Sequence, residues 1–184
     1  MLRDIDLLID PRSERLQPMQ PWPAWDGRAL LDMPVLFKTR GKTTTDHISP
    51  AGPWLRVRGH LERFSDSLLM GTTNAFTGAT GTCRNAFTGA MDQSVAATAR
   101  DYRSRRVPWI IVGDANYGEG SSREHAALSL RFRGGAAVIS RSFARIRESN
   151  LKKQGLLALT FAAPADYDRI RKDDLVTIGC EKAR

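Results

Sequence analysis

Residues 109–125 read WIIVGDANYGEGSSREH, and this stretch sets the expected fold. It opens with four large apolar residues without alternation, which is typical of a strand buried on both faces of a sheet. Gly113, Gly118 and Gly120 then indicate a loop, because glycine permits backbone conformations that other residues avoid. A helix is expected from Ser121 onward. The stretch therefore predicts a strand, a glycine-rich loop and a helix in succession.

The flanking segments continue this alternation. Helices are expected over 92–105, 144–154 and 165–171, and strands over 33–40, 53–60, 136–140, 156–161 and 175–179. Strands that alternate with helices indicate right-handed crossover units, and so an α/β fold with a partly parallel sheet. Ligands of such sheets lie beyond the carboxyl ends of the strands. The loop after Val112 is therefore the expected site.

The domain organisation follows from length and composition. A chain of 184 residues is long enough for one domain of ordinary size. Residues 1–32 mix prolines with Trp22 and Trp25, which favours an extended linker arm docked on a surface, and 33–184 are expected to form the domain. The sequence NAFTGA occurs at 74–79 and again at 85–90 within a long loop, and we interpret the repeat as coincidence.

Composition and charge narrow the classes of function. Hydrophobic residues make up 41% of the chain and charged residues 26%, as in soluble globular proteins. The net charge of +8 favours anionic partners without choosing among carboxylates, phosphates and nucleic acid. The chain has no apolar run long enough for a membrane span, and its acidic first residues are unlike a targeting peptide. We expect a cytoplasmic protein, or one of the mitochondrial matrix if the source is eukaryotic.

The two cysteines, Cys83 and Cys180, lie far apart in the sequence. Neither has a second cysteine at the spacing of a zinc or iron–sulfur site. Two free thiols in a reducing compartment are expected, and no metal site in this chain.

The loop before Ser121 has the properties of an anion site. A helix start offers unpaired backbone amides and the positive end of the helix dipole. Ser121 and Glu124 also fit a capping box, which would stabilise the helix without any ligand. The spacing matches neither a phosphate-binding P-loop nor a dinucleotide fingerprint. A small polycarboxylate fits better, because Arg123 and a second arginine could each bind a carboxylate.

Several strings carry a resemblance to a known family. They are TTDHIS at 44–49, AGPWL at 51–55, RGHL at 58–61, GEGSSREHAAL at 118–128, SFARI at 142–146 and NLKKQGLL at 150–157. Over about 13–179 the chain resembles the C-terminal swivel domain of the aconitases, of the mitochondrial and bacterial aconitase A-like type. The resemblance implies a swivelling three-layer β/α/β sandwich, as in the small subunit of isopropylmalate dehydratases.

The resemblance also implies roles for particular residues. In aconitases the first serine of the Ser-Ser-Arg string is the base that removes a substrate proton, which corresponds to Ser121. Ser122 and Arg123 would bind substrate carboxylate, and Arg58 in the RGHL string would be a further substrate-binding arginine. The substrate implied is a tricarboxylate, in the conversion of citrate to isocitrate through cis-aconitate.

Three histidines and one aspartate need separate treatment. By the same resemblance Asp46 and His47 lie in a loop that approaches the active site, either as supporting residues or as a structural pair. His60 and His125 are expected to be structural.

The resemblance further implies that this chain is incomplete as an enzyme. Aconitases bind a 4Fe-4S cluster through three cysteines on other domains, so a cluster-bearing large subunit or domains 1–3 of an aconitase would be the partner. Aconitase A-like chains continue past the strand at 175–179, whereas this one stops at Arg184. We therefore expect a lyase domain, either a fragment or a small subunit, that is inactive alone.

Two other functions remain open. The chain could be the small subunit of an isopropylmalate or homoaconitate hydro-lyase, although the long TTDHIS and AGPWL strings argue against it. It could also be a basic RNA-binding module, as the net charge suggests. Salt-dependent RNA binding would distinguish the second from both enzymatic readings.

Overall fold

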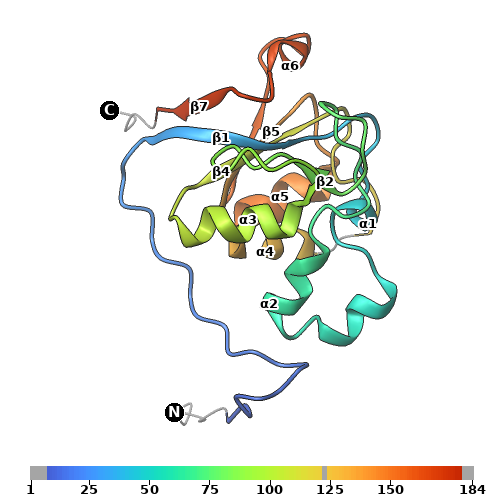
Figure 1. Cartoon of the computed structure of the whole chain (residues 1–184), viewed down its shortest axis with the longest axis vertical. Helices are drawn as coiled ribbons and strands as arrows, with labels where there is room; N and C mark the ends of the chain where they lie inside the picture. The colour runs from blue at the N-terminus through green and yellow to red at the C-terminus, as the bar shows by residue number, and fades with distance from the viewer. Residues whose placement is uncertain (1–7, 122–123, 180–184) are drawn as a thin grey trace.

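A computed structural model describes residues 8–121 and 124–179 of the chain. Its centre is a five-stranded sheet with the strand order β6-β5-β4-β1-β7 (Figure 1). The strands are β1 Leu30–Lys38, β4 Trp109–Gly113, β5 Gly135–Ser140, β6 Leu157–Thr160 and β7 Leu175–Ile178. The pairs β1–β4, β4–β5 and β5–β6 are parallel, and β7 pairs antiparallel with β1. The predicted α/β fold with a partly parallel sheet is confirmed.

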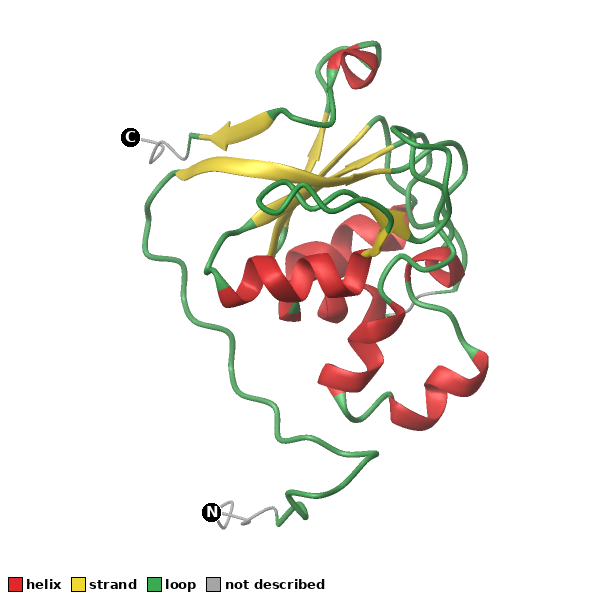
Figure 2. Ribbon diagram, in the orientation of Figure 1, coloured by secondary structure: helices red, strands yellow, loops and turns green. Residues whose placement is uncertain are grey.

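Three helices pack together on one face of the sheet (Figure 2). They are α3 Val95–Ser104, α4 His125–Phe132 and α5 Arg145–Lys153. Helix α3 shows why this face is buried: its N-cap Ser94 accepts a hydrogen bond from Ala97 N, and Val95, Ala99 and Tyr102 turn toward the sheet. The helical spacing of these apolar residues gives the helix one buried side.

The opposite face of the sheet carries a second, smaller core around Met33, Ile110 and Val112, all fully buried. Its cover comes from short segments, among them Phe76 and the helix α6 Asp166–Arg169 with its buried Tyr167. The residues of β4 are therefore buried on both sides. This is the environment that the continuous apolar run at 109–112 predicts.

The segment expected as a strand over 53–60 is helical instead. The chain forms α1 Thr45–Ile48, the 3-10 helix η1 Gly52–Val57, α2 Leu61–Phe64 and a second 3-10 turn η2 Ser65–Ser67. Pro53 stands at the start of η1, where its fixed φ and missing N–H suit a helical turn. No residue of η1 is buried. The apolar side chains that suggested a strand thus have no sheet to join.

The NAFTGA repeat is a structural repeat, and its interpretation as coincidence was wrong. In each copy the asparagine N–H bonds the carbonyl of the last alanine, from Asn74 to Ala79 at 2.8 Å and from Asn85 to Ala90 at 2.9 Å. In each copy the asparagine Oδ1 also accepts from the phenylalanine N–H two residues later, at 2.9 Å. Both asparagines are buried. The same six residues therefore build the same closed turn twice, on either side of the strand β2 Thr82–Cys83, which pairs with β3 Gln93–Ser94.

The N-terminal arm over 8–29 has no helix or strand and runs along the body of the domain (Figure 1). Leu16 pairs with Gly59 in an isolated bridge, and Trp22 Nε1 donates to Gln154 Oε1 at 3.2 Å. Trp25 remains 59% exposed. Strand β1 begins at Leu30, inside the expected arm. The division into a linker arm over 1–32 and a domain over 33–184 stays a prediction.

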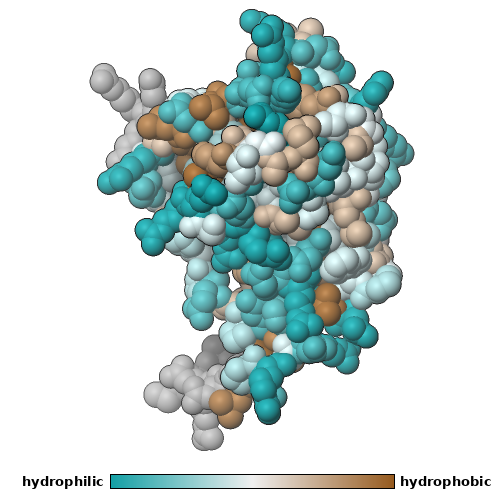
Figure 3. All heavy atoms as spheres, viewed as in Figure 1, coloured by the Kyte–Doolittle hydropathy of each residue, from teal (hydrophilic) through white to brown (hydrophobic). Residues whose placement is uncertain are grey.

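The surface is mixed in character. On the face shown in Figure 3, hydrophilic residues predominate over the lower part, and hydrophobic residues gather toward the end of the sheet that carries β7. Leu31 and Leu175 in this edge pair are 62% and 60% exposed. Among the described residues, no helix has the length and apolarity needed to cross a membrane.

Candidate active site

The predicted site loop leaves the carboxyl end of β4 and is held on both sides by backbone hydrogen bonds. On one side Gly118 N donates to Thr43 O at 2.7 Å, and Thr45 N donates to Glu119 O at 2.9 Å. On the other side Tyr117 N donates to Ser142 O at 2.9 Å, and Ala144 N donates to Tyr117 O at 3.1 Å. The loops after β1, β4 and β5 therefore meet at one end of the sheet.

Two glutamate side chains, at 119 and 124, make further contacts in this region. Lys42 Nζ and Glu119 Oε2 form an ion pair at 2.7 Å that spans the loops after β1 and β4. Helix α4 starts at His125 and not at Ser121 as predicted. Glu124 at its N-cap makes no capping hydrogen bond with its side chain, and its Oε1 accepts instead from Gln154 Nε2 at 2.9 Å. The capping role expected for Glu124 is thus replaced by a contact with the end of α5.

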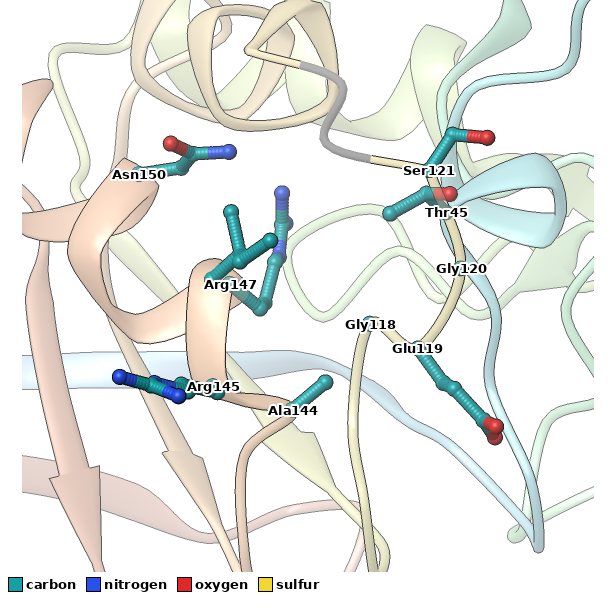
Figure 4. A pocket seen from close by; sticks show the side chains of 10 residues that line it. Thr45, Gly118, Glu119, Gly120, Ser121, Ala144, Arg145, Arg147 and Asn150 are labelled. Carbon is teal, nitrogen blue, oxygen red and sulfur yellow. The ribbon is translucent and has the colours of Figure 1, made fainter.

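Ser121 lines a cavity of about 200 Å³ between this loop and the start of α5 (Figure 4). The other lining residues are Thr45, Gly118, Glu119, Gly120, Ala144, Arg145, Ile146, Arg147 and Asn150. In Figure 4 the Arg147 side chain rises into the gap, whereas the Glu119 carboxylate and the Ser121 hydroxyl point away from it. Ser122 and Arg123 lie outside the described residues.

Arg147 is the residue of this cavity that sequence reasoning missed. Its side chain is 2% exposed, and its Nη2 donates to Ala126 O at 3.3 Å. Burial lowers the pKa of the Arg147 guanidinium, and the neighbouring Tyr117 opposes that shift. Arg147 lies between two of the resemblance strings, SFARI at 142–146 and NLKKQGLL at 150–157, and nothing in the pattern of one sequence shows that it is a buried cation. A second arginine was expected at the site, but it was assigned to Arg58.

Comparison with known proteins agrees with this architecture. Residues 33–164 match the family model of the aconitase C-terminal domain. The chain belongs to this family. Mitochondrial aconitate hydratase of Arthroderma benhamiae is 57% identical over 176 residues, which cover 96% of this chain and 23% of that protein. The mitochondrial aconitate hydratase of Saccharomyces cerevisiae is 53% identical over 174 residues, which cover 95% of this chain and 22% of that protein.

A solved structure shares the fold of this aconitase C-terminal domain. It is 3-isopropylmalate dehydratase from Methanocaldococcus jannaschii, with a TM-score of 0.52 and 25% sequence identity, and the match covers 82% of this chain and 71% of that chain. The resemblance predicted from the sequence strings is therefore confirmed at the level of family and fold. The chain spans less than a quarter of the length of the two aconitate hydratases.

Arg58 occupies a different part of this aconitase C-terminal domain from the one the sequence suggested. It lies at the end of η1 and is exposed, where we expected a strand edge. Its backbone carbonyl is 3.1 Å from His125 Nε2, at the first residue of α4. Arg58 lines a separate cavity of about 320 Å³ with Ser49, Pro50, Leu55, Phe64, Glu124 and His125. The structure thus brings Arg58 to the start of α4, but not into the cavity that Ser121 lines.

The histidines of the domain take part in backbone contacts. His47 N donates to Thr44 Oγ1 and His47 Nδ1 accepts from Thr44 N, both at 3.2 Å, so the two residues form a capping box at the start of α1. His60 Nδ1 similarly accepts from Arg63 N at 3.4 Å. Asp46, next to His47, is exposed. His47 therefore has a structural contact that the sequence pattern did not reveal.

The described residues do not fit an iron–sulfur cluster. Such clusters are bound by thiolates. Burial raises the pKa of Cys83 to about 11, against a hydrogen bond with Thr98, so this thiol remains protonated at neutral pH. Within 8–121 and 124–179, no three His, Cys, Asp or Glu side chains group closely enough to hold a metal ion. Cys180 lies outside the described residues.

Proposed function

We propose that this chain is the substrate-binding and proton-abstracting domain of an aconitase-type hydro-lyase, which converts citrate to isocitrate through cis-aconitate. The observation that carries the proposal is the position of Ser121. It lies in the loop between β4 and α4, where the loops after three parallel strands converge, in a chain of the aconitase C-terminal family. Ligand sites of open α/β sheets lie at this end of the strands.

The chemistry assigned to Ser121 requires a positive environment. A serine hydroxyl is a poor base in water, and it becomes useful when cations or helix-end amides stabilise its alkoxide. Arg123 and the amides of the helix start would supply this positive environment, because the Ser121 hydroxyl points away from the cavity that Arg145 and Arg147 line (Figure 4).

In the proposed step Ser121 Oγ accepts the proton from the substrate carbon next to a carboxylate. The electron pair of the broken C–H bond would form the double bond of cis-aconitate, and the hydroxyl of the adjacent carbon would leave toward the part of the active site that lies outside this chain. Ser122, Arg123 and Arg58 would bind the substrate carboxylates, with Asp46 and His47 as supporting residues.

The rest of the active site would come from outside this chain. The family resemblance implies a 4Fe-4S cluster, and the described residues offer no ligand set for it. We propose that a large subunit or further aconitase domains carry the cluster and that this chain alone is inactive. The relatives are named as mitochondrial proteins, which favours the mitochondrial matrix over the cytoplasm for this chain.

A second candidate function is the small subunit of an isopropylmalate or homoaconitate hydro-lyase. The fold shared with 3-isopropylmalate dehydratase supports it. The higher identity to aconitate hydratases, 57% against 25%, favours the aconitase function.

Complementation tests both candidates. The purified chain is mixed with a cluster-loaded aconitase that lacks its C-terminal domain, and formation of cis-aconitate from isocitrate is followed by ultraviolet absorbance. We expect no activity from the chain alone and activity from the mixture. The same assay with a large subunit of isopropylmalate dehydratase and with isopropylmalate should remain silent. Activity of the chain alone, or activity only with isopropylmalate, would reject the proposed function.

A further inference from the structure

Arg58 lies in a segment that is weakly held by its own contacts. No residue of η1 is buried, and Arg58 and Gly59, which follow it, are exposed. Arg58 N lies 3.4 Å from Leu55 O, beyond the usual range of backbone hydrogen bonds. Gly59 is held by the N-terminal arm, since its carbonyl accepts from Gln17 N at 2.9 Å. The position of the Arg58 backbone therefore depends on contacts with neighbouring elements.

His125, the first residue of α4, contacts Arg58 itself. The His125 Nε2 atom lies 3.1 Å from the Arg58 carbonyl oxygen. A carbonyl oxygen can only accept, so Nε2 carries a proton and donates the hydrogen bond. The His125 ring also packs against the ring of Phe64, with centroids 5.0 Å apart and planes at 61°, and Phe64 is buried in α2. The imidazole is therefore held by an aromatic contact while its N–H binds the Arg58 backbone.

Helix α4 gives His125 a firm support. The apolar side chains on the inner side of this helix belong to the larger core of the domain. At the other end of the helix, Arg133 is fully buried and donates to Glu62 O and to Asp66 Oδ1, both at 2.7 Å. Helix α4 is thus tied at both ends to the segment formed by η1, α2 and η2. Its first residue can therefore fix where the Arg58 backbone lies.

We propose that His125 is a positioning residue for substrate binding, because its Nε2–H fixes the Arg58 backbone at the start of α4. The inference rests on the proposed function, in which Arg58 binds a substrate carboxylate. Arg58 and His125 line one cavity of about 320 Å³, and the Ser-Ser-Arg string at 121–123 ends two residues before His125 in the chain. An arginine binds a carboxylate well only where its guanidinium is held in the right place, since small displacements weaken the interaction. His125 would hold Arg58 at a fixed distance from the residues that begin at Ser121.

The test compares KM and kcat of the complemented enzyme for isocitrate. His125→Phe keeps an aromatic ring against Phe64 and removes the donor, so KM should rise about threefold to tenfold while kcat stays within about twofold. His125→Gln can still donate through its side-chain amide, so its KM should stay close to that of the unsubstituted chain. The matched control is His60→Asn, which keeps a side-chain acceptor for Arg63 N and should leave both constants unchanged.

Two further measurements separate positioning from a merely structural role. The Gly59 amide shares its peptide group with the Arg58 carbonyl, so its nuclear magnetic resonance signal in the chain alone should shift in His125→Phe and return in His125→Gln. In an Arg58→Met background, His125→Phe should raise KM no further, because the side chain through which His125 acts is gone.

The outcomes distinguish this inference from the proposed function. The inference is overturned if the Gly59 signal does not move in His125→Phe, if the KM of that variant is unchanged, or if KM rises equally with and without Arg58. It is also overturned if His125→Gln behaves as His125→Phe does. A mixture that is inactive even with the unsubstituted chain would reject the proposed function, and this inference with it.

Discussion

Replacing Gly118 with alanine measures how tightly the site loop packs against α5. Gly118 has a φ of +81°, and an added Cβ would lie 2.4 Å from Arg147 Cγ and 2.6 Å from Arg147 Cδ. A side chain in the left-handed region costs about 1–2 kcal/mol. Overpacking adds about 1–3 kcal/mol, because the buried Arg147 stem cannot move aside freely. We therefore expect Gly118→Ala to lower the free energy of unfolding by about 2–5 kcal/mol.

Urea unfolding followed by circular dichroism measures this value, and two variants separate its parts. Gly89 has a φ of +72° and nothing within 4 Å of an added Cβ, so Gly89→Ala should report the backbone part alone, about 1–2 kcal/mol. In an Arg147→Ala background the Cγ and Cδ atoms are gone and only the contact with Cβ, at 3.0 Å, remains, so Gly118→Ala should then cost less than in the unsubstituted chain and approach the cost of Gly89→Ala. The packing described here is wrong if Gly118→Ala costs the same in both backgrounds, or no more than Gly89→Ala does.

Three further predictions concern the rest of the domain. Arg133 and Arg100 hold the pKa of Glu62 below its usual 4.5, although burial alone would raise it. The stability that this carboxylate contributes is therefore present above pH 4.5 and is lost as the pH falls through the folded pKa. Acid unfolding of Glu62→Gln should show a weaker pH dependence than that of the unsubstituted chain, and equal slopes would contradict this. Burial raises the pKa of Cys83 to about 11. In a Cys180→Ser background, Cys83 should therefore react with iodoacetamide at pH 8 far more slowly in the native chain than in guanidinium. Comparable rates would show that the thiol is accessible. Asn85→Ala should lower the free energy of unfolding by about 2–3 kcal/mol in urea, because the N–H groups of Phe87 and Thr88 lose their buried acceptor and Asp101 loses a donor; a change under about 0.5 kcal/mol would argue against the turn.

The central strands were predictable because a strand that is buried on both faces has a continuous run of apolar residues in its sequence. The strand expected over 109–112 corresponds to β4 Trp109–Gly113, and the helix expected over 144–154 corresponds to α5 Arg145–Lys153. The strand predicted over 53–60 was wrong. The aromatic and branched residues of this segment favour strands locally, but no neighbouring strand is available to pair with them. A proline at the start of a turn was the better signal there.

The site was only partly predictable, because its decisive contacts join residues that are distant in sequence. The Ser-x-x-Glu spacing at 121–124 suggested a capping box, but Gln154, thirty residues further on, binds Glu124 instead. Arg147 gave no signal of its own, since its burial arises only when α5 packs against the loop after β4. The NAFTGA repeat was visible in the sequence, and only its hydrogen bonds showed that it is structural.

The central claim is that Ser121 removes the substrate proton, and the rate of the complemented enzyme tests it most directly. The chain and its Ser121→Ala variant are each mixed with the same cluster-loaded partner, and kcat and KM for isocitrate are measured under identical conditions. Loss of a positioned base should lower kcat by about a hundredfold or more, with KM little changed. Ser121→Thr, which keeps a hydroxyl, should retain more activity than Ser121→Ala. A kcat for Ser121→Ala within about threefold of the unsubstituted chain would contradict the account.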